Sequence, residues 1–540
     1  MQILTLLNHS FIFAFGLCYS FYLLFGALQA GAFLTIYKKL TKSGSNNLNP
    51  DIDLSLCYFA GFSLTLLLLI IFSIFHISFS CSVTIIAATY LLIIILGKTY
   101  RDLILRISHK DLCLFFLLIV FFSIQNLCNW TFDGASYDMH ASPHSSFGSM
   151  ESGRYSNIAN FIIRSDFIPV LGQNYLHSIY AAFNQSNSSL FNLYALLSLN
   201  QAIFFICLLK NSQRLFKLDA GFSWLVTLFI YFGSWSISKS HIFLIDSGAP
   251  LFITGYSDTI ISLGSFLAFY VIANSGIQLT KKSLLIFVIS FGWAFCAPQN
   301  ILFGMTYLSL VALVKFVRTA KIEWQPLTAS SVAIAFASMF GGMISPLFRR
   351  TIDHNIMGIL ETSEKVSPKI KPSFDYLVFH SAEPGFGFTH ISINFFSNGL
   401  NGSIDLIRIL FIPLLGIGLW LFFRNRKELS KELKSHELGI CTFILTLLFI
   451  LLVSFGENKW AVSRFILPGL MINILVLAKI AEHHFKNIKT SSFRMILVLA
   501  ALIFFIPTSS TIYYRWSYYF NSGMIQSVSK LLTLTNDIGS

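Results

Sequence analysis

Acidic residues that could act in catalysis are concentrated in one polar segment of the sequence, residues 129–188. Asp133 and Asp138 come early in this segment, and Glu151 follows just before a stretch with helical apolar spacing. A carboxylate that is partly removed from water becomes more basic and can take a proton from a hydroxyl group. We therefore nominate Asp138 first and Asp133 second as a general base, with Glu151 as an alternative or an orienting residue. Solvated loop acids, and an ordinary turn at Asp133-Gly134, are the structural alternatives.

Arginines beside the polar segments are candidates for binding a phosphate group. Arg154 follows Glu151, the pair Arg349 and Arg350 opens a second long polar segment at 348–404, and Arg464 precedes a later apolar run. A guanidinium group matches two phosphate oxygens at once. The alternative is that these arginines anchor helix ends at a membrane surface.

The second polar segment ends in a stretch rich in aromatic residues and glycines. His380, Glu383 and His390 lie within it and are candidate substrate-binding residues. Its aromatic rings could stack on sugars, or could lie in a membrane interface, where aromatic residues are enriched. Asp138, His140 and His144 are residue types that bind metals, but Pro143 interrupts the helix that would align them. No metal ligand is nominated; no cofactor is certain, and a divalent cation is compatible with the chemistry.

The composition indicates which elements must position these residues. The chain has 540 residues, of which 55% are hydrophobic, 16% aromatic and only 11% charged. Soluble domains carry about 25% charged residues. Apolar runs such as 55–75 and 437–455 reach the roughly 20 residues needed to cross a bilayer. These features exclude a soluble enzyme, a nucleic-acid-binding protein and a disordered scaffold.

The net charge of +13 comes from short basic clusters between the apolar runs. Because basic residues are retained on the cytoplasmic side of membranes, these clusters orient the chain. The sequence predicts an all-α, polytopic membrane protein with about 14 transmembrane helices, both termini outside, and two long outer loops carrying interfacial helices. The predicted spans are 8–36, 55–77, 81–97, 111–128, 189–209, 221–238, 257–275, 283–297, 300–317, 328–346, 405–423, 437–455, 465–482 and 492–507. The short pair around 296–300 could instead be one broken helix or a re-entrant element.

These spans divide the chain into six parts. The predicted parts are N-terminal transmembrane helices at 1–128, the first outer loop at 129–188, central helices at 189–347, the second outer loop at 348–404, C-terminal helices at 405–507 and an outer tail at 508–540. Candidate catalytic residues lie in the first outer loop. Any chemistry is therefore expected on the outer face of the membrane.

The order of residues in the first outer loop resembles that of GT-C glycosyltransferases. The matching positions are Asp133 or Asp138, then Glu151, Gly153, Tyr155, Ile158 and Ala159, then Pro169, and finally Gln173, Asn174 and Tyr175. The resemblance implies a polytopic enzyme that takes sugar from a polyprenyl-phosphate donor by an inverting mechanism. It also implies that Tyr155, Gln173 and Tyr175 contact substrate. In this chain about four predicted spans precede the loop, whereas the family usually places it after the first.

The expected function is transfer of a sugar from a lipid-linked donor to a glycan or glycolipid acceptor at the outer face. The expected location is multi-pass in a bacterial inner (plasma) membrane, with the active site facing the periplasm and membrane lipid, but no nucleic acid, as a partner. One alternative is an O-antigen or polysaccharide polymerase or ligase that uses a lipid-pyrophosphate oligosaccharide. The other is a lipid-linked glycan transporter or flippase, for which internal repeats would be typical; none is found.

Overall fold

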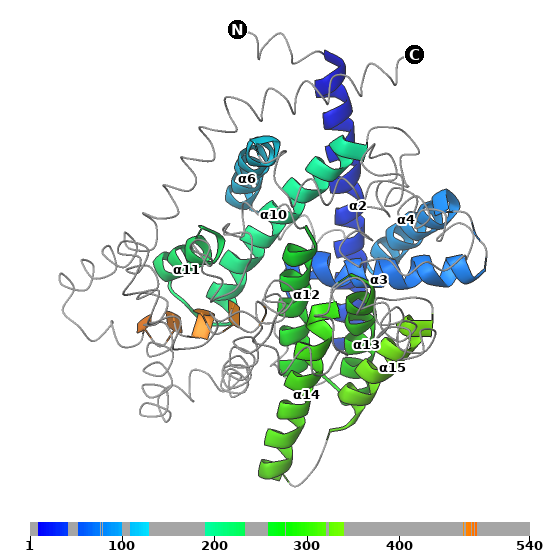
Figure 1. The fold of residues 1–540 in the computed structure, drawn as a ribbon, viewed down its shortest axis with the longest axis vertical. Helices are drawn as coiled ribbons and strands as arrows, with labels where there is room; N and C mark the ends of the chain where they lie inside the picture. Colours follow the sequence, from blue (N-terminus) through cyan, green and yellow to red (C-terminus); the bar gives the residue numbers. More distant parts are fainter. Residues whose placement is uncertain are drawn as a thin grey trace, which may run out of the picture.

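A computed structural model describes residues 9–41, 52–99 except 76 and 78, 108–128, 189–232, 257–339 except 276, 297 and 320–322, and scattered positions between 468 and 482. Within these ranges the chain is helical and contains no β-strand. Figure 1 shows the arrangement of the helices. They are α2 (His9–Thr41), α3 (Leu54–Ile74), α4 (Phe79–Leu96), α6 (His109–Cys128), α10 (Ser189–Arg214), α11 (Ala220–Phe232), α12 (Ser257–Asn274), α13 (Leu279–Cys296), α14 (Pro298–Thr319) and α15 (Gln325–Met339).

The described helices fall where the sequence predicts apolar spans. Each of the ten predicted spans between 8 and 346 overlaps one helix, so the all-α class is confirmed for the described part of the chain. By length and hydropathy, one described stretch, Tyr19–Thr41 within α2, meets the requirements for crossing a bilayer. Shorter apolar stretches lie in α3, α4, α12 and α14. The number of membrane crossings therefore stays a prediction.

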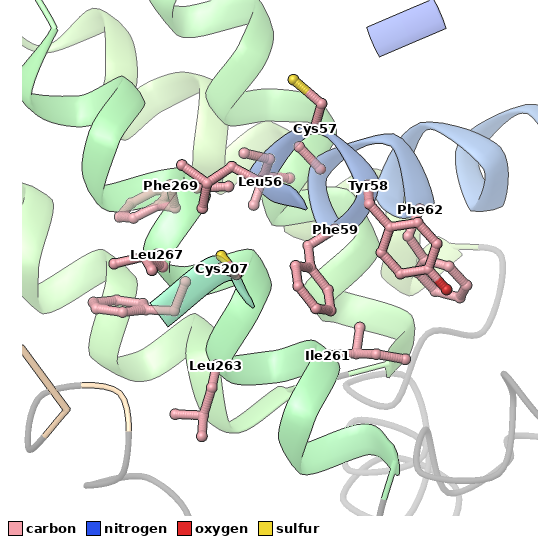
Figure 2. Packing of buried hydrophobic residues seen from close by; sticks show 14 of the residues in the cluster. Leu56, Cys57, Tyr58, Phe59, Phe62, Cys207, Ile261, Leu263, Leu267 and Phe269 are labelled. Atoms are coloured by element: carbon pink, nitrogen blue, oxygen red, sulfur yellow. The ribbon is translucent and has the colours of Figure 1, made fainter. Parts of the chain in front are cut away.

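Helix α3 lies at the centre of the described helices. In Figure 1 it runs across the long direction of α2, α12 and α13, and it packs against α2, α4, α10, α12 and α13. Its side chains are buried on several sides, as the consecutive residues Cys57, Tyr58 and Phe59 show. Figure 2 shows residues of α3 among side chains of α10 and α12, including Cys207 and Ile261. A helix that is apolar all round belongs in such an interior position.

Glycines allow the backbones around α3 to approach closely. A Cβ atom added at Gly61 of α3 would lie 2.6 Å from the backbone carbonyl oxygen of Gln29 in α2. A Cβ added at Gly264 of α12 would lie 2.4 Å from Cδ2 of the fully buried Phe59. Both contacts are closer than side-chain carbons tolerate, so these two crossings require glycine. Small residues at helix crossings are typical of helices packed within a membrane.

Hydrogen bonds between buried polar side chains connect α3 to three neighbouring helices. Gln29 Nε2 of α2 donates to the Tyr58 carbonyl oxygen at 2.8 Å, and the Thr65 hydroxyl donates to Gln29 Oε1 at 3.0 Å. Tyr90 of α4 lies 3.0 Å from the Thr65 hydroxyl. The Tyr58 hydroxyl donates to Asn200 Oδ1 of α10 at 2.6 Å. Because buried polar groups are costly unless they are bonded, these pairings fix which helices meet.

The chain turns sharply between α13 and α14. A Cβ added at Gly304 would lie 2.6 Å from Trp293 Cζ3, although eleven positions separate the two residues. In one straight helix those residues would stand about 16 Å apart along the axis. Pro298 occupies the first position of α14, where its missing N–H costs nothing. The pair around 296–300 is therefore two helices in contact and not one continuous helix.

A buried ion pair from the C-terminal third clamps the connection between α10 and α11. Lys479 Nζ lies 3.0 Å from Glu482 Oε2 and donates to the Lys217 carbonyl oxygen at 2.7 Å. Glu482 Oε1 accepts the Asp219 backbone N–H at 3.1 Å, just before the start of α11. Figure 1 shows this segment in orange beside α11. The ammonium thus binds a carbonyl oxygen within the connection, and the carboxylate binds the N–H that precedes α11, where the helix dipole favours a negative charge.

Two helices expose long apolar faces. On α4 the exposed side chains include Leu91, Leu92 and Leu96, and on α6 they include Phe116 and Leu117. Leu96 and Leu117 each leave 68% of their surface exposed. Contiguous apolar surface of this kind is rare on soluble proteins and marks contact with lipid or with another protein.

The Gly61 crossing predicts a matched pair of glycine substitutions. We expect Gly61→Ala to lower the free energy of unfolding by about 1–3 kcal/mol, because the new methyl group must push the α2 backbone away. Gly221→Ala is the control, since no atom lies within 4 Å of its added Cβ. It should leave stability equal or raise it by about 0.5–1 kcal/mol. Unfolding of the purified protein in mixed micelles measures both; equal effects would contradict the close crossing.

The clamp on the α10–α11 connection predicts a non-additive mutant cycle. Glu482→Leu should cost about 3–5 kcal/mol, because it leaves the Lys479 ammonium buried without a counter-charge. The double variant Lys479→Met, Glu482→Leu should cost less than the sum of the single changes. Glu323→Gln, which breaks the part-exposed pair with Lys315, should cost no more than about 1 kcal/mol. Strictly additive losses in the same unfolding assay would rule out the clamp.

Candidate functional site

The residues nominated from the sequence lie outside the described residues. They are Asp133, Asp138, Glu151, Arg154, Tyr155, Gln173, Tyr175, Arg349, Arg350, His380, Glu383, His390 and Arg464. The outer loops 129–188 and 348–404, to which all but Arg464 belong, lie there as well. Their roles stay predictions, and the structure describes the helices on either side of the first loop.

The two helices that flank the first loop are neighbours. Near one end of the pair, Tyr19 of α2 forms hydrogen bonds with Ser123 of α6 and Ser198 of α10. At the other end, Lys210 Nζ of α10 lies 2.8 Å from Asp111 Oδ2 of α6. Since these contacts run in opposite order along the two helices, α6 and α10 are antiparallel. The chain therefore leaves α6 and re-enters α10 on the same side, which is the predicted outer side.

A cavity of about 360 Å³ lies between α2, α3, α6 and α10. Its walls are mostly apolar, with Leu23 and Ala27 from α2, Phe115 from α6, and Leu199 and Ile203 from α10. The volume falls within the range of about 300–1,000 Å³ that is typical of small-molecule sites. The cavity can hold an apolar chain or ring.

One end of the cavity carries charged and polar groups. Asp53, just before α3, and Ser55 of α3 line it together with the Asp111–Lys210 ion pair. The Asp53 carboxylate is buried. It accepts hydrogen bonds from the Leu54 backbone N–H at 2.7 Å and from the Ser55 hydroxyl at 2.5 Å. These bonds cap the beginning of α3, where acidic residues are favoured. This end, the cavity mouth, lies where the sequence predicts the cytoplasmic side.

The groups of the cavity mouth differ in their access to solvent. The side chain of Lys210 is 21% exposed and that of Asp111 is 33% exposed. Arg214 is more open, at 47%, and its Nη1 lies 4.0 Å from Asp53 Oδ1. The mouth therefore offers the Asp111 carboxylate and the Lys210 ammonium to a bound molecule, while Asp53 caps the helix and Arg214 lies beside the mouth, next to Asp53.

The side of the cavity is continuous with the exposed apolar surface. Leu24, Leu112 and Phe116 line the cavity and are themselves 69%, 40% and 52% exposed. An apolar molecule could thus enter sideways from a lipid phase. Within the described part of the chain, no group of three His, Cys, Asp or Glu residues is placed to hold a metal ion.

The cavity is not predicted by the sequence, in which Lys210 and Arg214 follow an apolar run and are expected only as membrane anchors. Gln29, Asn200 and Gln201 stand inside predicted spans and are not among the predicted site residues. The available signal is that side-chain amides within an apolar run need partners, and Gln29 and Asn200 bond to another helix. Which helices provide those partners could not be read from the order of residues.

No protein-family model, curated protein or solved structure matches this chain.

Proposed function

We propose that this chain is a multi-pass integral membrane protein with about 14 spans and its long loops on the outer face. The composition and the exposed apolar faces of α4 and α6 support this location. The pairing of helix ends supports it as well. Lys210 binds Asp111, and Lys479 binds the α10–α11 connection. Both contacts join segments that the basic clusters independently assign to the cytoplasmic side.

The proposed activity is that of a GT-C-like glycosyltransferase acting at the outer, periplasmic face. The observation that carries it is the set of carboxylates in the first loop, Asp133, Asp138 and Glu151, in a pattern resembling the acidic loop of that class. The antiparallel contact of α6 and α10 supports the proposal, because it brings both ends of the loop to one place at the membrane surface.

The chemistry assigns a role to each nominated group. Asp138 takes the proton of the acceptor hydroxyl, whose oxygen attacks the anomeric carbon of the donor sugar as the bond to the lipid phosphate breaks. Asp133 and Glu151 are the alternatives for this role. Arg154 and the Arg349–Arg350 pair stabilise the negative charge that develops on the departing phosphate. The configuration at the anomeric carbon is inverted.

A second candidate is a polymerase or ligase of lipid-pyrophosphate-linked oligosaccharide. The arginines in both outer loops favour it, because a pyrophosphate needs more cationic contacts than a single phosphate. A lipid-linked glycan flippase is the third candidate, with no repeat in the sequence to support it.

The membrane orientation predicts the accessibility of two introduced cysteines. All eight native cysteines are replaced by alanine, and a single cysteine is placed by Ser146→Cys in the first outer loop or by Ser430→Cys in a basic segment predicted inside. A membrane-impermeant maleimide should label the first variant in intact cells and the second only after permeabilisation. Equal labelling of both variants in intact cells would overturn the topology.

The proposed base predicts the loss of sugar transfer in two asparagine variants. Purified protein in lipid is assayed with polyprenyl-phosphate monosaccharides and polyprenyl-pyrophosphate oligosaccharides. Asp138→Asn should lower transfer by about 10²–10⁴-fold, the effect of losing a general base, with Asp133→Asn as the second candidate. Glu323→Gln is the control, because it removes a carboxylate near the predicted cytoplasmic end of α14.

The donor that supports transfer separates a transferase from a polymerase or ligase. If wild-type protein transfers sugar and neither asparagine variant slows it, the activity stands and the assigned base is wrong. If correctly folded wild-type protein transfers from no donor in either set, the proposed activity is contradicted and flippase assays become the next step.

A further inference from the structure

We propose that the cavity between α2, α3, α6 and α10 binds one phospholipid whose headgroup carries a phosphate and a primary ammonium group, as in phosphatidylethanolamine. This site is distinct from the proposed outer-face chemistry, because its charged mouth lies at the predicted cytoplasmic ends of α6 and α10. The inference needs the chain to lie in a bilayer, but it does not need the chain to transfer sugar.

The cavity suits part of an acyl chain. Its walls are apolar side chains such as Leu23, Phe115 and Ile203, and its volume is about 360 Å³. Burying a methylene group gains about 0.8 kcal/mol over leaving it in water. An acyl chain in the bilayer interior is already out of water, so it does not gain this free energy when it enters the cavity. The acyl chain is therefore a general feature of the ligand, and the headgroup must provide the selectivity.

The position of the cavity gives a lipid direct access. Leu24 and Phe116 line the cavity and are also more than half exposed, so its side opens onto the apolar face of α6. A lipid could enter laterally with its chain in the cavity and its headgroup at the mouth. Beyond the charged mouth a water-soluble ligand would meet mostly apolar walls, which makes a membrane lipid the occupant that the geometry favours.

The charges at the mouth select the headgroup. Lys210 and Asp111 face each other at 2.8 Å and both remain partly exposed, so each can also contact a bound group. A phosphate fits Lys210, with Arg214 as a second accessible cation. A primary ammonium fits Asp111, to which it can donate charge-assisted hydrogen bonds. A headgroup with both charges thus gives Lys210 an additional negative partner and Asp111 an additional positive partner.

Other common headgroups satisfy the mouth less well. A choline group carries a positive charge but has no N–H to donate to Asp111. A glycerol headgroup leaves the phosphate beside the Asp111 carboxylate with no cation of its own to offset the repulsion. The structure therefore predicts the order phosphatidylethanolamine, then phosphatidylcholine or phosphatidylglycerol.

Native mass spectrometry of the delipidated full-length protein in detergent tests this order. The protein is titrated with dioleoyl phosphatidylethanolamine, phosphatidylcholine and phosphatidylglycerol under identical conditions. We expect one phosphatidylethanolamine to be retained about tenfold more tightly than either competitor, the effect of one charge-assisted hydrogen bond. Equal retention of the three lipids by wild-type protein would overturn the proposal without the need for any variant.

Variants locate the site. Asp111→Asn should remove the preference for ethanolamine over choline while total binding persists, and Lys210→Gln should weaken binding of all three lipids. Ala27→Phe, at an exposed position in the cavity wall, should displace the acyl chain and so weaken binding of all three lipids as well. The first variant tests the headgroup, and the last tests the cavity.

Matched controls separate this site from general lipid contact. Glu323→Gln breaks another lysine ion pair at a predicted cytoplasmic helix end, and Leu91→Phe alters an exposed apolar face outside the cavity. Neither should change the retained lipid. If the ethanolamine preference survives Asp111→Asn and Ala27→Phe in protein that keeps its wild-type melting temperature, the lipid binds elsewhere and the proposal fails. Loss of sugar transfer is not a readout here, so failure of either proposal leaves the other intact.

Discussion

The described structure depends on how closely other helices can approach α3. At Gly61 the backbone of α2 comes so near that a single methyl group would meet the Gln29 carbonyl oxygen, and at Gly264 the ring of Phe59 fills the space of a missing side chain. In the bilayer proposed for this chain, apolar side chains would gain little by leaving the solvent, so close packing and buried hydrogen bonds would hold the helices together. The bonds of Gln29, Thr65 and Tyr58 stand at these same crossings and fix the partners.

Charged groups complete the assembly at one end of the helices. Lys210 joins α10 to α6, and the Lys479–Glu482 pair joins a distant segment to the α10–α11 connection. The second pair is buried, and each of its charges also binds a backbone group of the α10–α11 connection. Such a pair contributes chiefly to specificity, because a partner of the wrong kind would leave a buried charge unsatisfied.

The proposed chemistry and the proposed lipid site use different parts of the same scaffold. Helices α6 and α10 hold both ends of the acidic first loop at their predicted outer ends, and they form two walls of the cavity towards their inner ends. A rigid helix pair can position a loop for catalysis while the opposite end contacts the bilayer. A lipid wedged between the two helices would also support the geometry on which the loop depends.

The sequence by itself determined the helical class and the positions of the helices, because hydropathy over some twenty residues is a local property that a span must satisfy wherever it packs. The acidic first outer loop stays a prediction, because its residues stand outside the described structure. Only the tertiary structure decided that α3 is central, that α13 and α14 fold back on each other, that Lys479 and Glu482 bridge the α10–α11 connection, and that four helices line a cavity. These features join residues far apart in the chain, and the side chains that meet are set by the shapes of opposing helix surfaces, which the order of residues along one helix does not contain.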